Sequence, residues 1–179
     1  LGQSDAAGQI FPYASVCLNL AEDHLVWHGS FPDYRDAKAL VYRNTKVACV
    51  YNKADAATRV MVEEADVVEG ARAIGFDLGV PGPSDLGIVD GILVDRAFHD
   101  DRRNSALELS TLAELDAAGL AAPHIVQNIL AAAALARSLG VEPRAIAGAL
   151  SGFRLDAHRI QVIARHRGVT WVDDSKATN

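Results

Sequence analysis

The chain has 179 residues, of which 50% are apolar and 22% charged, a composition typical of a folded globular protein and too apolar for a disordered one. Its net charge of -6 argues against a protein that mainly binds a nucleic-acid backbone, although a local anion site remains compatible with it. No apolar run reaches the roughly 18 residues of a membrane span, and LGQSDAAGQIF at the start does not resemble a signal peptide. We therefore expect a cytoplasmic protein that binds neither nucleic acid nor membrane.

The first half of the chain alternates apolar runs with helix signals. Residues 14–20, ASVCLNL, predict a buried strand, and Ser30 with Asp33 forms a capping box that starts a helix ending near Asn44. The following elements are predicted in chain order as a strand at 46–52, a helix at 54–65 and a strand around 71–78. A Gly/Pro-rich break, GVPGPSD, then separates this half from the next.

The second half begins with a hairpin, because Asp90-Gly91 supplies the positive φ of a two-residue turn between two apolar runs. An alanine-rich helix is predicted at 121–139, with Gly140 at its C-terminal end, and a shorter helix begins near Pro143. Two further strands are expected around an Arg167-Gly168 turn.

This order of elements predicts an α/β fold with a mostly parallel sheet flanked by helices and one antiparallel hairpin. We expect residues 1–150 to form one domain and residues 151–179 to form the first strands of another. The two cysteines, Cys17 and Cys49, each lie in a short apolar run, which favours two buried free thiols over a disulfide or a zinc site.

The segment after the first strand, AEDHLVWHG, holds four potential metal ligands, Glu22, Asp23, His24 and His28. Loops at the carboxyl ends of parallel strands commonly bind ligands, and the spacing of the two histidines suits a metal pair on a helix. The alternative is a surface loop with one packed and one solvated histidine. Lys38, on the following helix, is by itself a solvated lysine.

Two other places favour a bound anion. APHIVQN opens the alanine-rich helix, and helix N-termini attract negative charge, although His124, Gln127 and Asn128 are equally explained as first-turn polar residues. Arg159 in AHR could hold a phosphate with its planar guanidinium, or be a surface charge. The sequence GxxxxGK[ST] of a phosphate loop does not occur in the chain.

Taken in order, LNLAEDHLVWHG…YRDAK, PHIVQN, AHR and VDDSKATN resemble the Mur ligases of peptidoglycan synthesis from about Val16 onward. DDSKATN favours the D-glutamate-adding branch of the family. The resemblance implies an ATP-dependent, amide-forming ligase that uses Mg²⁺, with UDP-N-acetylmuramoyl-L-alanine and D-glutamate as substrates. The acid would be activated as an acyl phosphate, a reaction that depends on cationic groups around the transferred phosphoryl group.

The resemblance also assigns roles. It makes His24 a magnesium ligand and Lys38 a carbamylated lysine whose added carboxylate faces that metal. Asn128 would contact adenine, Arg159 the ATP phosphates and Asp174 the ribose. The residues expected to place D-glutamate are Lys176 and Thr178. The sequence departs from the family pattern at Val26, Ile125 and Gln161.

The family's phosphate loop, its N-terminal domain and most of its C-terminal domain have no counterpart in these residues, so we expect a fragment that is inactive by itself. Two alternatives stay open. One is another Mur ligase or a folylpolyglutamate synthetase, against which DDSKATN argues. The other is a binding module that derives from such an enzyme and has lost catalysis.

Overall fold

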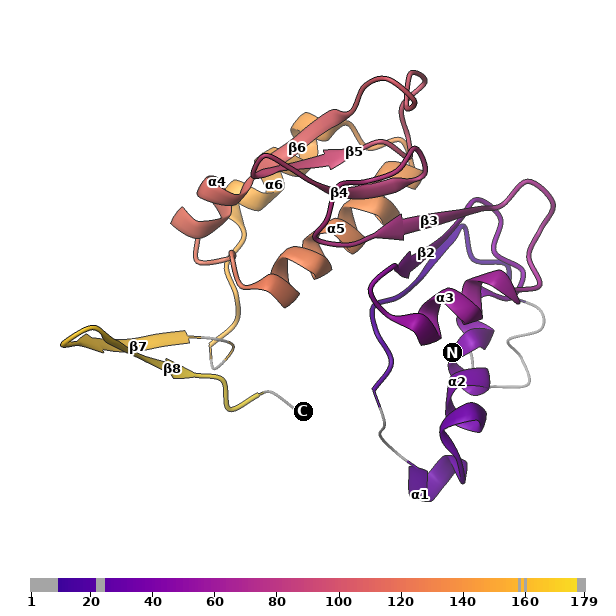
Figure 1. Cartoon of the computed structure of the whole chain (residues 1–179), viewed down its shortest axis with the longest axis horizontal. Helices are drawn as coiled ribbons and strands as arrows, with labels where there is room; N and C mark the ends of the chain where they lie inside the picture. The colour runs from indigo at the N-terminus through magenta and orange to yellow at the C-terminus, as the bar shows by residue number, and fades with distance from the viewer. Residues whose placement is uncertain (1–9, 22–24, 158, 160, 177–179) are drawn as a thin grey trace.

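The computed structural model describes residues 10–21, 25–157, 159 and 161–176. Its centre is a six-stranded sheet whose strands lie side by side in chain order, from β1 to β6 (Figure 1). The strands are β1 (Ala14–Cys17), β2 (Ala48–Asn52), β3 (Arg72–Phe76), β4 (Asp85–Val89), β5 (Ile92–Asp95) and β6 (Leu107–Thr111).

The sheet is mostly parallel, as predicted. Strands β1 to β4 run parallel, β5 is antiparallel to β4, and β6 is antiparallel to β5. β6 therefore points the same way as β1 to β4. We call the edge at which β1, β2, β3 and β6 end the carboxyl edge, and the opposite edge, where β5 ends, the amino edge.

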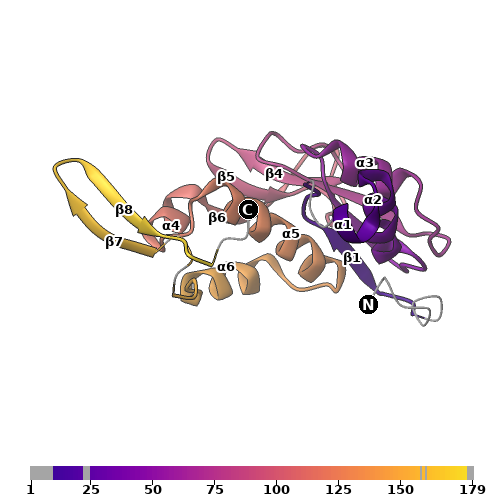
Figure 2. The ribbon, with the colours of Figure 1, turned by 90° about the horizontal axis from the view of Figure 1, so that it is seen from below.

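Helices cover both faces of the sheet. The helical elements are α1 (Leu25–His28), α2 (Phe31–Ala39), the 3-10 turn η2 (Leu40–Tyr42), α3 (Ala56–Glu63), α4 (Leu112–Ala117), α5 (Pro123–Ser138) and α6 (Pro143–Gly152). Figure 2 shows α2 and α3 on one side of the sheet and α5 and α6 on the other. In β2, Ala48 and Val50 belong to the core cluster that contains α5, whereas Cys49 packs with Met61 of α3. Because successive residues of a strand face opposite sides, α3 and α5 cover opposite faces.

Local signals set several boundaries as expected. Ser30 caps α2, its hydroxyl accepting from the backbone N–H of Asp33 at 3.3 Å. The Asp90-Gly91 turn is confirmed, with φ of 50° and 79°. The helix predicted from Ser30 to Asn44 is shorter than expected. α2 ends at Ala39 and continues as η2, and Asn44 then turns the chain with a φ of 57°.

Residues 161–173 form a separate two-stranded sheet, β7 (Gln161–His166) and β8 (Val169–Asp173), as predicted around Arg167-Gly168. Figure 1 shows this hairpin projecting away from the six-stranded sheet. Its apolar side chains are largely exposed, with Ile163 at 63% and Trp171 at 59%. The predicted division at residue 150 falls within α6, which extends to Gly152, and stays a prediction.

Two further points concern the described part of the chain. Both cysteines are free, and Cys49 is buried as predicted. The prediction of burial is wrong for Cys17, which is only partly buried because it is the last residue of β1 and lies at the carboxyl edge. Among the described residues, no helix combines the length and the apolar character needed to cross a bilayer.

Candidate active site at the carboxyl edge

The segment that leaves β1 is held by the turn between β2 and α3. The buried amide of Asn52 donates to the carbonyl of Leu18 at 3.0 Å, and Asp55 Oδ2 accepts from the backbone N–H of Leu20 at 2.7 Å. The other oxygen of Asp55 caps α3, accepting from its first N–H groups at 2.8 and 3.2 Å. These bonds fix Leu18 and Leu20 in place, and His24 lies outside the described residues.

Lys38 lies close to this segment. It is exposed on α2, with its Nζ 5.4 Å from the centroid of the Tyr34 ring, and the ring of His28 packs on the same tyrosine at 5.0 Å between centroids. Burial raises the pKa of the Cys17 thiol, the charge of Asp55 raises it further, and the charge of Lys38 opposes the rise. The structure therefore brings Lys38 into the electrostatic surroundings of the end of β1.

The described residues do not by themselves form a metal site. They contain no group of three His, Cys, Asp or Glu side chains that could hold an ion. Lys38 as an ammonium would repel a cation, and becomes an oxygen donor only as a carbamate. The described residues of this region thus hold no preformed cation site.

A lysine and two aspartates at the same edge form a cluster that the sequence reasoning missed. Lys53 Nζ lies 2.7 Å from Asp85 Oδ2 and 3.8 Å from Asp77 Oδ2. Gly75 makes room for it, since a Cβ there would come within 2.6 Å of the Lys53 side chain. Lys53 follows β2 and Asp77 follows β3, so the rule that ligand-binding residues follow parallel strands would have singled out both.

Asn128 is placed by the direction of α5. β6 ends at the carboxyl edge and leads through α4 into α5, which packs back across the sheet with its first turns near that edge (Figure 1). Asn128 and His124 are exposed there, and Gln127 is half-buried. Ile125, one of the departures from the family pattern, packs against the main core. Where the family pattern would place a polar side chain, this chain therefore has an apolar side chain that packs on the core.

The remaining predicted residues belong to the C-terminal segment. Arg159 is exposed in a turn where its backbone N–H donates to the carbonyl of Asp156 at 3.3 Å. Asp174 and Lys176 are exposed after β8, and Thr178 lies outside the described residues. Within the described part of the chain, no hydrogen bond or ion pair joins Arg159 or Lys176 to Lys38 or Asn128. The structure thus leaves the predicted residues in two groups.

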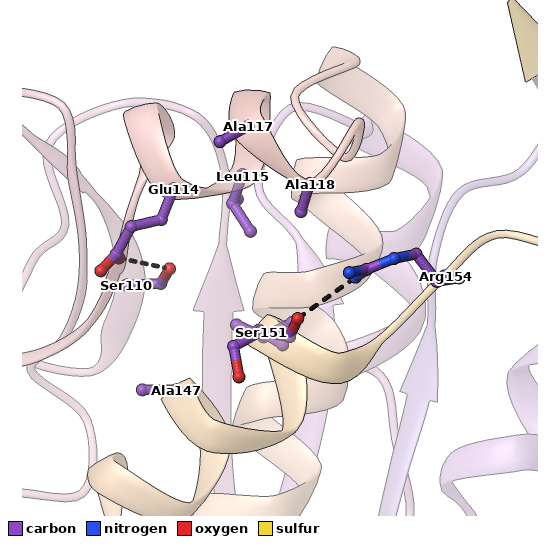
Figure 3. A pocket seen from close by; sticks show the side chains of 9 residues that line it. Ser110, Glu114, Leu115, Ala117, Ala118, Ala147, Ser151 and Arg154 are labelled. Carbon is purple, nitrogen blue, oxygen red and sulfur yellow. Dashed lines mark hydrogen bonds between the residues drawn. The ribbon is translucent and has the colours of Figure 1, made fainter.

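A pocket of about 310 Å³ lies between α4 and α6, near the end of β6 (Figure 3). Glu114 is on one side, accepting from Ser110 Oγ at 3.1 Å and from the N–H of Thr111 at 2.9 Å. Arg154 is on the other side and donates to the carbonyl of Ser151 at 3.2 Å. None of the site residues predicted from the sequence lines this pocket.

Comparison with known proteins supports the family that the motifs indicate. No protein-family model matches the chain. It is, however, 68% identical over 175 residues to the UDP-N-acetylmuramoylalanine–D-glutamate ligase of Leifsonia xyli. The matched residues cover 98% of this chain and 34% of that protein. The ligase of the same name from Streptomyces avermitilis is 54% identical over 167 residues, or 93% of this chain and 35% of that protein.

Solved structures agree on the fold. MurF from Acinetobacter baumannii superimposes with a TM-score of 0.59 at 19% identity, covering 94% of this chain and 35% of that one. A UDP-N-acetylmuramoyl-L-alanyl-D-glutamate–2,6-diaminopimelate ligase superimposes with a TM-score of 0.63 at 22% identity. The match covers 86% of this chain and 30% of that one. The chain spans about a third of the length of the relatives it matches. Over the segment that it spans, it belongs to the Mur ligase family.

Proposed function

We propose that the chain is the central part of a cytoplasmic ligase that joins D-glutamate to UDP-N-acetylmuramoyl-L-alanine with ATP and Mg²⁺. The observation that carries this proposal is the 68% identity over 175 residues to a ligase of that specificity. The exposed polar residues that gather near the carboxyl edge, Lys38 and Asn128, suit a site at this position.

The reaction has two steps. A carboxylate oxygen of the acceptor attacks the γ-phosphorus of ATP and ADP leaves, and the amine of D-glutamate then attacks the acyl carbon and phosphate leaves. In this proposal Asn128 binds adenine, Arg159 binds phosphate and Asp174 binds ribose. Lys176 and Thr178 position the amino acid. When bound, Mg²⁺ would neutralise charge that develops on the transferred group.

On the metal side, His24 and Lys38 would be the protein's contribution, with Lys38 acting as its carbamate. Tyr34 supports this role, because its buried ring lies under the Lys38 side chain and limits where the Nζ can reach. Asn52 and Asp55 would support it indirectly, by holding the segment from which His24 emerges.

The separation of the predicted residues implies that this chain alone does not perform the reaction. Arg159 and Asp174 lie on the C-terminal segment, away from the sheet, and a phosphate-loop sequence does not occur in the 179 residues. For phosphoryl transfer, the residues near the carboxyl edge, those of the C-terminal segment and a phosphate loop would all have to contact the same nucleotide.

The test is a chimera in which the matched residues of this chain replace the corresponding segment of the Leifsonia xyli ligase. We expect the chimera to incorporate D-glutamate in an ATP-dependent reaction and to discriminate against L-lysine. Lys38→Arg keeps the positive charge but cannot become a carbamate, so activity should fall roughly a hundredfold. Lys46→Arg, the same change at an exposed lysine elsewhere, is the matched control and should stay within twofold of the unsubstituted chimera.

Three results would contradict the proposal. A folded chimera that hydrolyses ATP without incorporating D-glutamate would argue for another specificity. Equal losses in Lys38→Arg and Lys46→Arg would remove the assignment of Lys38. Robust ATP hydrolysis by the isolated chain would show that the nucleotide site is complete without the segments assigned here to the rest of the enzyme.

A further inference from the structure

A recess of about 480 Å³ opens at the amino edge, the end of the sheet opposite to the site described above. Arg72 is the first residue of β3, and the remaining lining residues follow β5, which runs antiparallel and ends at the same edge. These lining residues are Arg72, Ala97, Phe98, His99, Asp100 and Arg102.

The wall of the recess is rigidly built. The guanidinium of Arg72 donates to the carbonyl of Ala97 at 2.7 Å and lies 5.6 Å from the centroid of the Phe98 ring. The buried carboxylate of Asp95 accepts from the backbone N–H groups of Ala97 and Phe98 at 2.8 and 2.9 Å. The other oxygen of Asp95, Oδ2, lies 2.8 Å from Nε of Arg137, which holds the carboxylate in place. Arg72, the first residue of β3, is therefore bonded to a loop that the core holds in place.

The recess carries an excess of positive charge. Within the described part of the chain, neither Arg72 nor Arg102 forms an ion pair. Burial lowers the pKa of Arg72 and the charge of Arg102 lowers it further; Asp95 opposes this effect, but its carboxylate is already bound to Arg137. Asp100, which is exposed, is the only acid that lines the recess.

The imidazole of His99 adds another potential donor. One ring nitrogen, Nε2, lies 2.6 Å from Ser105 Oγ, and this bond orients the ring at the mouth of the recess. Two guanidinium groups and an imidazole thus surround a polar space, in a chain whose overall charge is negative. An anion bound there would relieve the repulsion between Arg72 and Arg102.

We propose that the recess between Arg72 and Arg102 is a binding site for a phosphate-type dianion, either inorganic phosphate or a phosphate monoester. A dianion matches the two guanidinium charges, and the planar donors of arginine suit tetrahedral oxyanions. The bound anion would link the start of β3 to the loop after β5. This site involves none of the residues proposed for ATP, so it does not depend on the proposed function.

The experiment is calorimetric titration of the chain with inorganic phosphate and, separately, with glycerol 3-phosphate, at constant ionic strength set with chloride. We expect saturable binding of one anion per chain. Arg102→Gln should weaken it roughly tenfold or more, because a charge-assisted contact is lost. Arg103→Gln removes the same charge from the exposed neighbouring residue and should change the affinity by less than twofold.

Tighter binding of glycerol 3-phosphate would identify a monoester as the ligand, and tighter binding of phosphate would identify the free anion. Chemical shifts of the Ala97 and Phe98 amides should move during the titration and stay unchanged in Arg102→Gln. The absence of saturable binding, or equal weakening by Arg102→Gln and Arg103→Gln, would overturn the proposal, since the chain would then attract anions only through its surface charge.

Discussion

Asp55 joins two segments at the carboxyl edge, because one of its oxygens accepts from the backbone N–H of Leu20 at 2.7 Å while the other caps α3. The strand that leads toward His24 and the helix that follows β2 are therefore fixed to each other by a single side chain. A change at Asp55 would disturb both the helix and the path of the chain after β1.

The first prediction concerns this link. Asp55→Ala removes the cap of α3 and the bond to Leu20, and we expect the free energy of unfolding to fall by about 2–3 kcal/mol. Urea unfolding measures the loss, and hydrogen exchange at the Leu20 amide should accelerate. Asp66→Ala, at an exposed aspartate, is the control. If exchange at Leu20 did not change in Asp55→Ala, the carboxylate would not be holding this segment.

A second prediction concerns the buried ion pair between Arg137 and Asp95. Arg137 also donates to the carbonyls of Val141 and Phe98, at 2.6 and 2.7 Å, so the pair ties the end of α5 to the loop after β5. Arg137→Met leaves the buried carboxylate uncompensated and should cost about 3–5 kcal/mol of unfolding free energy. Arg144→Met on the exposed face of α6 should cost little by the same measurement. Similar losses in the two variants would show that the ion pair is not the cause.

Much of the fold could be predicted from local signals. The strands β1, β2 and β3 and the hairpin of β4 and β5 correspond to apolar runs with clear turn residues between them. β6 and α4 were not predicted, because only Leu107 and Leu109 alternate in β6 and the preceding loop is polar. A signal was nevertheless present, since Thr111 and Glu114 form a capping box that starts α4.

The candidate site was harder to predict, because its groups depend on tertiary contacts. The pairing of Lys53 with Asp85 joins residues 32 positions apart, and only the space left by Gly75 permits it. The motifs singled out Lys38 and Asn128, which lie near the carboxyl edge, and their roles stay predictions. They could not indicate that Arg159 and Asp174 would lie on a projecting segment, since a motif carries no information on how domains close.

A third prediction uses the ionisation of Cys49. Burial raises the pKa of this thiol to about 11, from about 9.0 in the unfolded chain, and the hydroxyl of Thr45 opposes the rise. The fold therefore favours the neutral thiol. Its contribution to stability is complete below pH 9 and is lost as the pH rises toward 11.

The test compares the unfolding free energy of the wild-type chain and Cys49→Ala at pH 9 and pH 11. The wild-type chain should lose about 2 kcal/mol more than the variant over this interval. Titrating groups that do not interact with Cys49 affect both proteins equally and cancel in the comparison. Tyr42 does not cancel completely, because burial and then the charges of Cys17 and Cys49 raise its pKa. Parallel losses in the two proteins would show that the Cys49 thiol does not ionise differently in the two states.

A fourth prediction concerns the modification of Lys38. In the isolated chain its Nζ is an exposed cation above the Tyr34 ring, and the described residues provide no metal site to stabilise a carbamate. In ¹³C NMR spectra recorded with labelled bicarbonate, we expect the isolated chain to show no carbamate signal that depends on Lys38. Its spectrum should therefore match that of Lys38→Arg. The chimera with the Leifsonia xyli ligase should show such a signal when Mg²⁺ is present. A Lys38-dependent carbamate in the isolated chain would mean that this segment alone suffices to stabilise it.

The last prediction concerns nucleotide binding by the isolated chain. Asn128 is on α5 and Arg159 lies beyond α6, without a described contact that brings them to the same ligand. Each would contribute only part of the binding free energy, so Mg-ATP should bind more weakly than a Kd of about 1 mM, which corresponds to roughly 4 kcal/mol. Calorimetric titration measures this affinity, with Arg159→Ala as the comparison.

The two possible results separate the role of the C-terminal segment from that of the sheet. Weak binding that is the same in Arg159→Ala would mean that the nucleotide site is completed by segments beyond this chain. Submillimolar binding that is lost in Arg159→Ala would mean that the segment from Arg159 to Asp174 holds nucleotide without α5. Domain closure would then be required for phosphoryl transfer but not for capture of ATP, because binding and chemistry would depend on different residues.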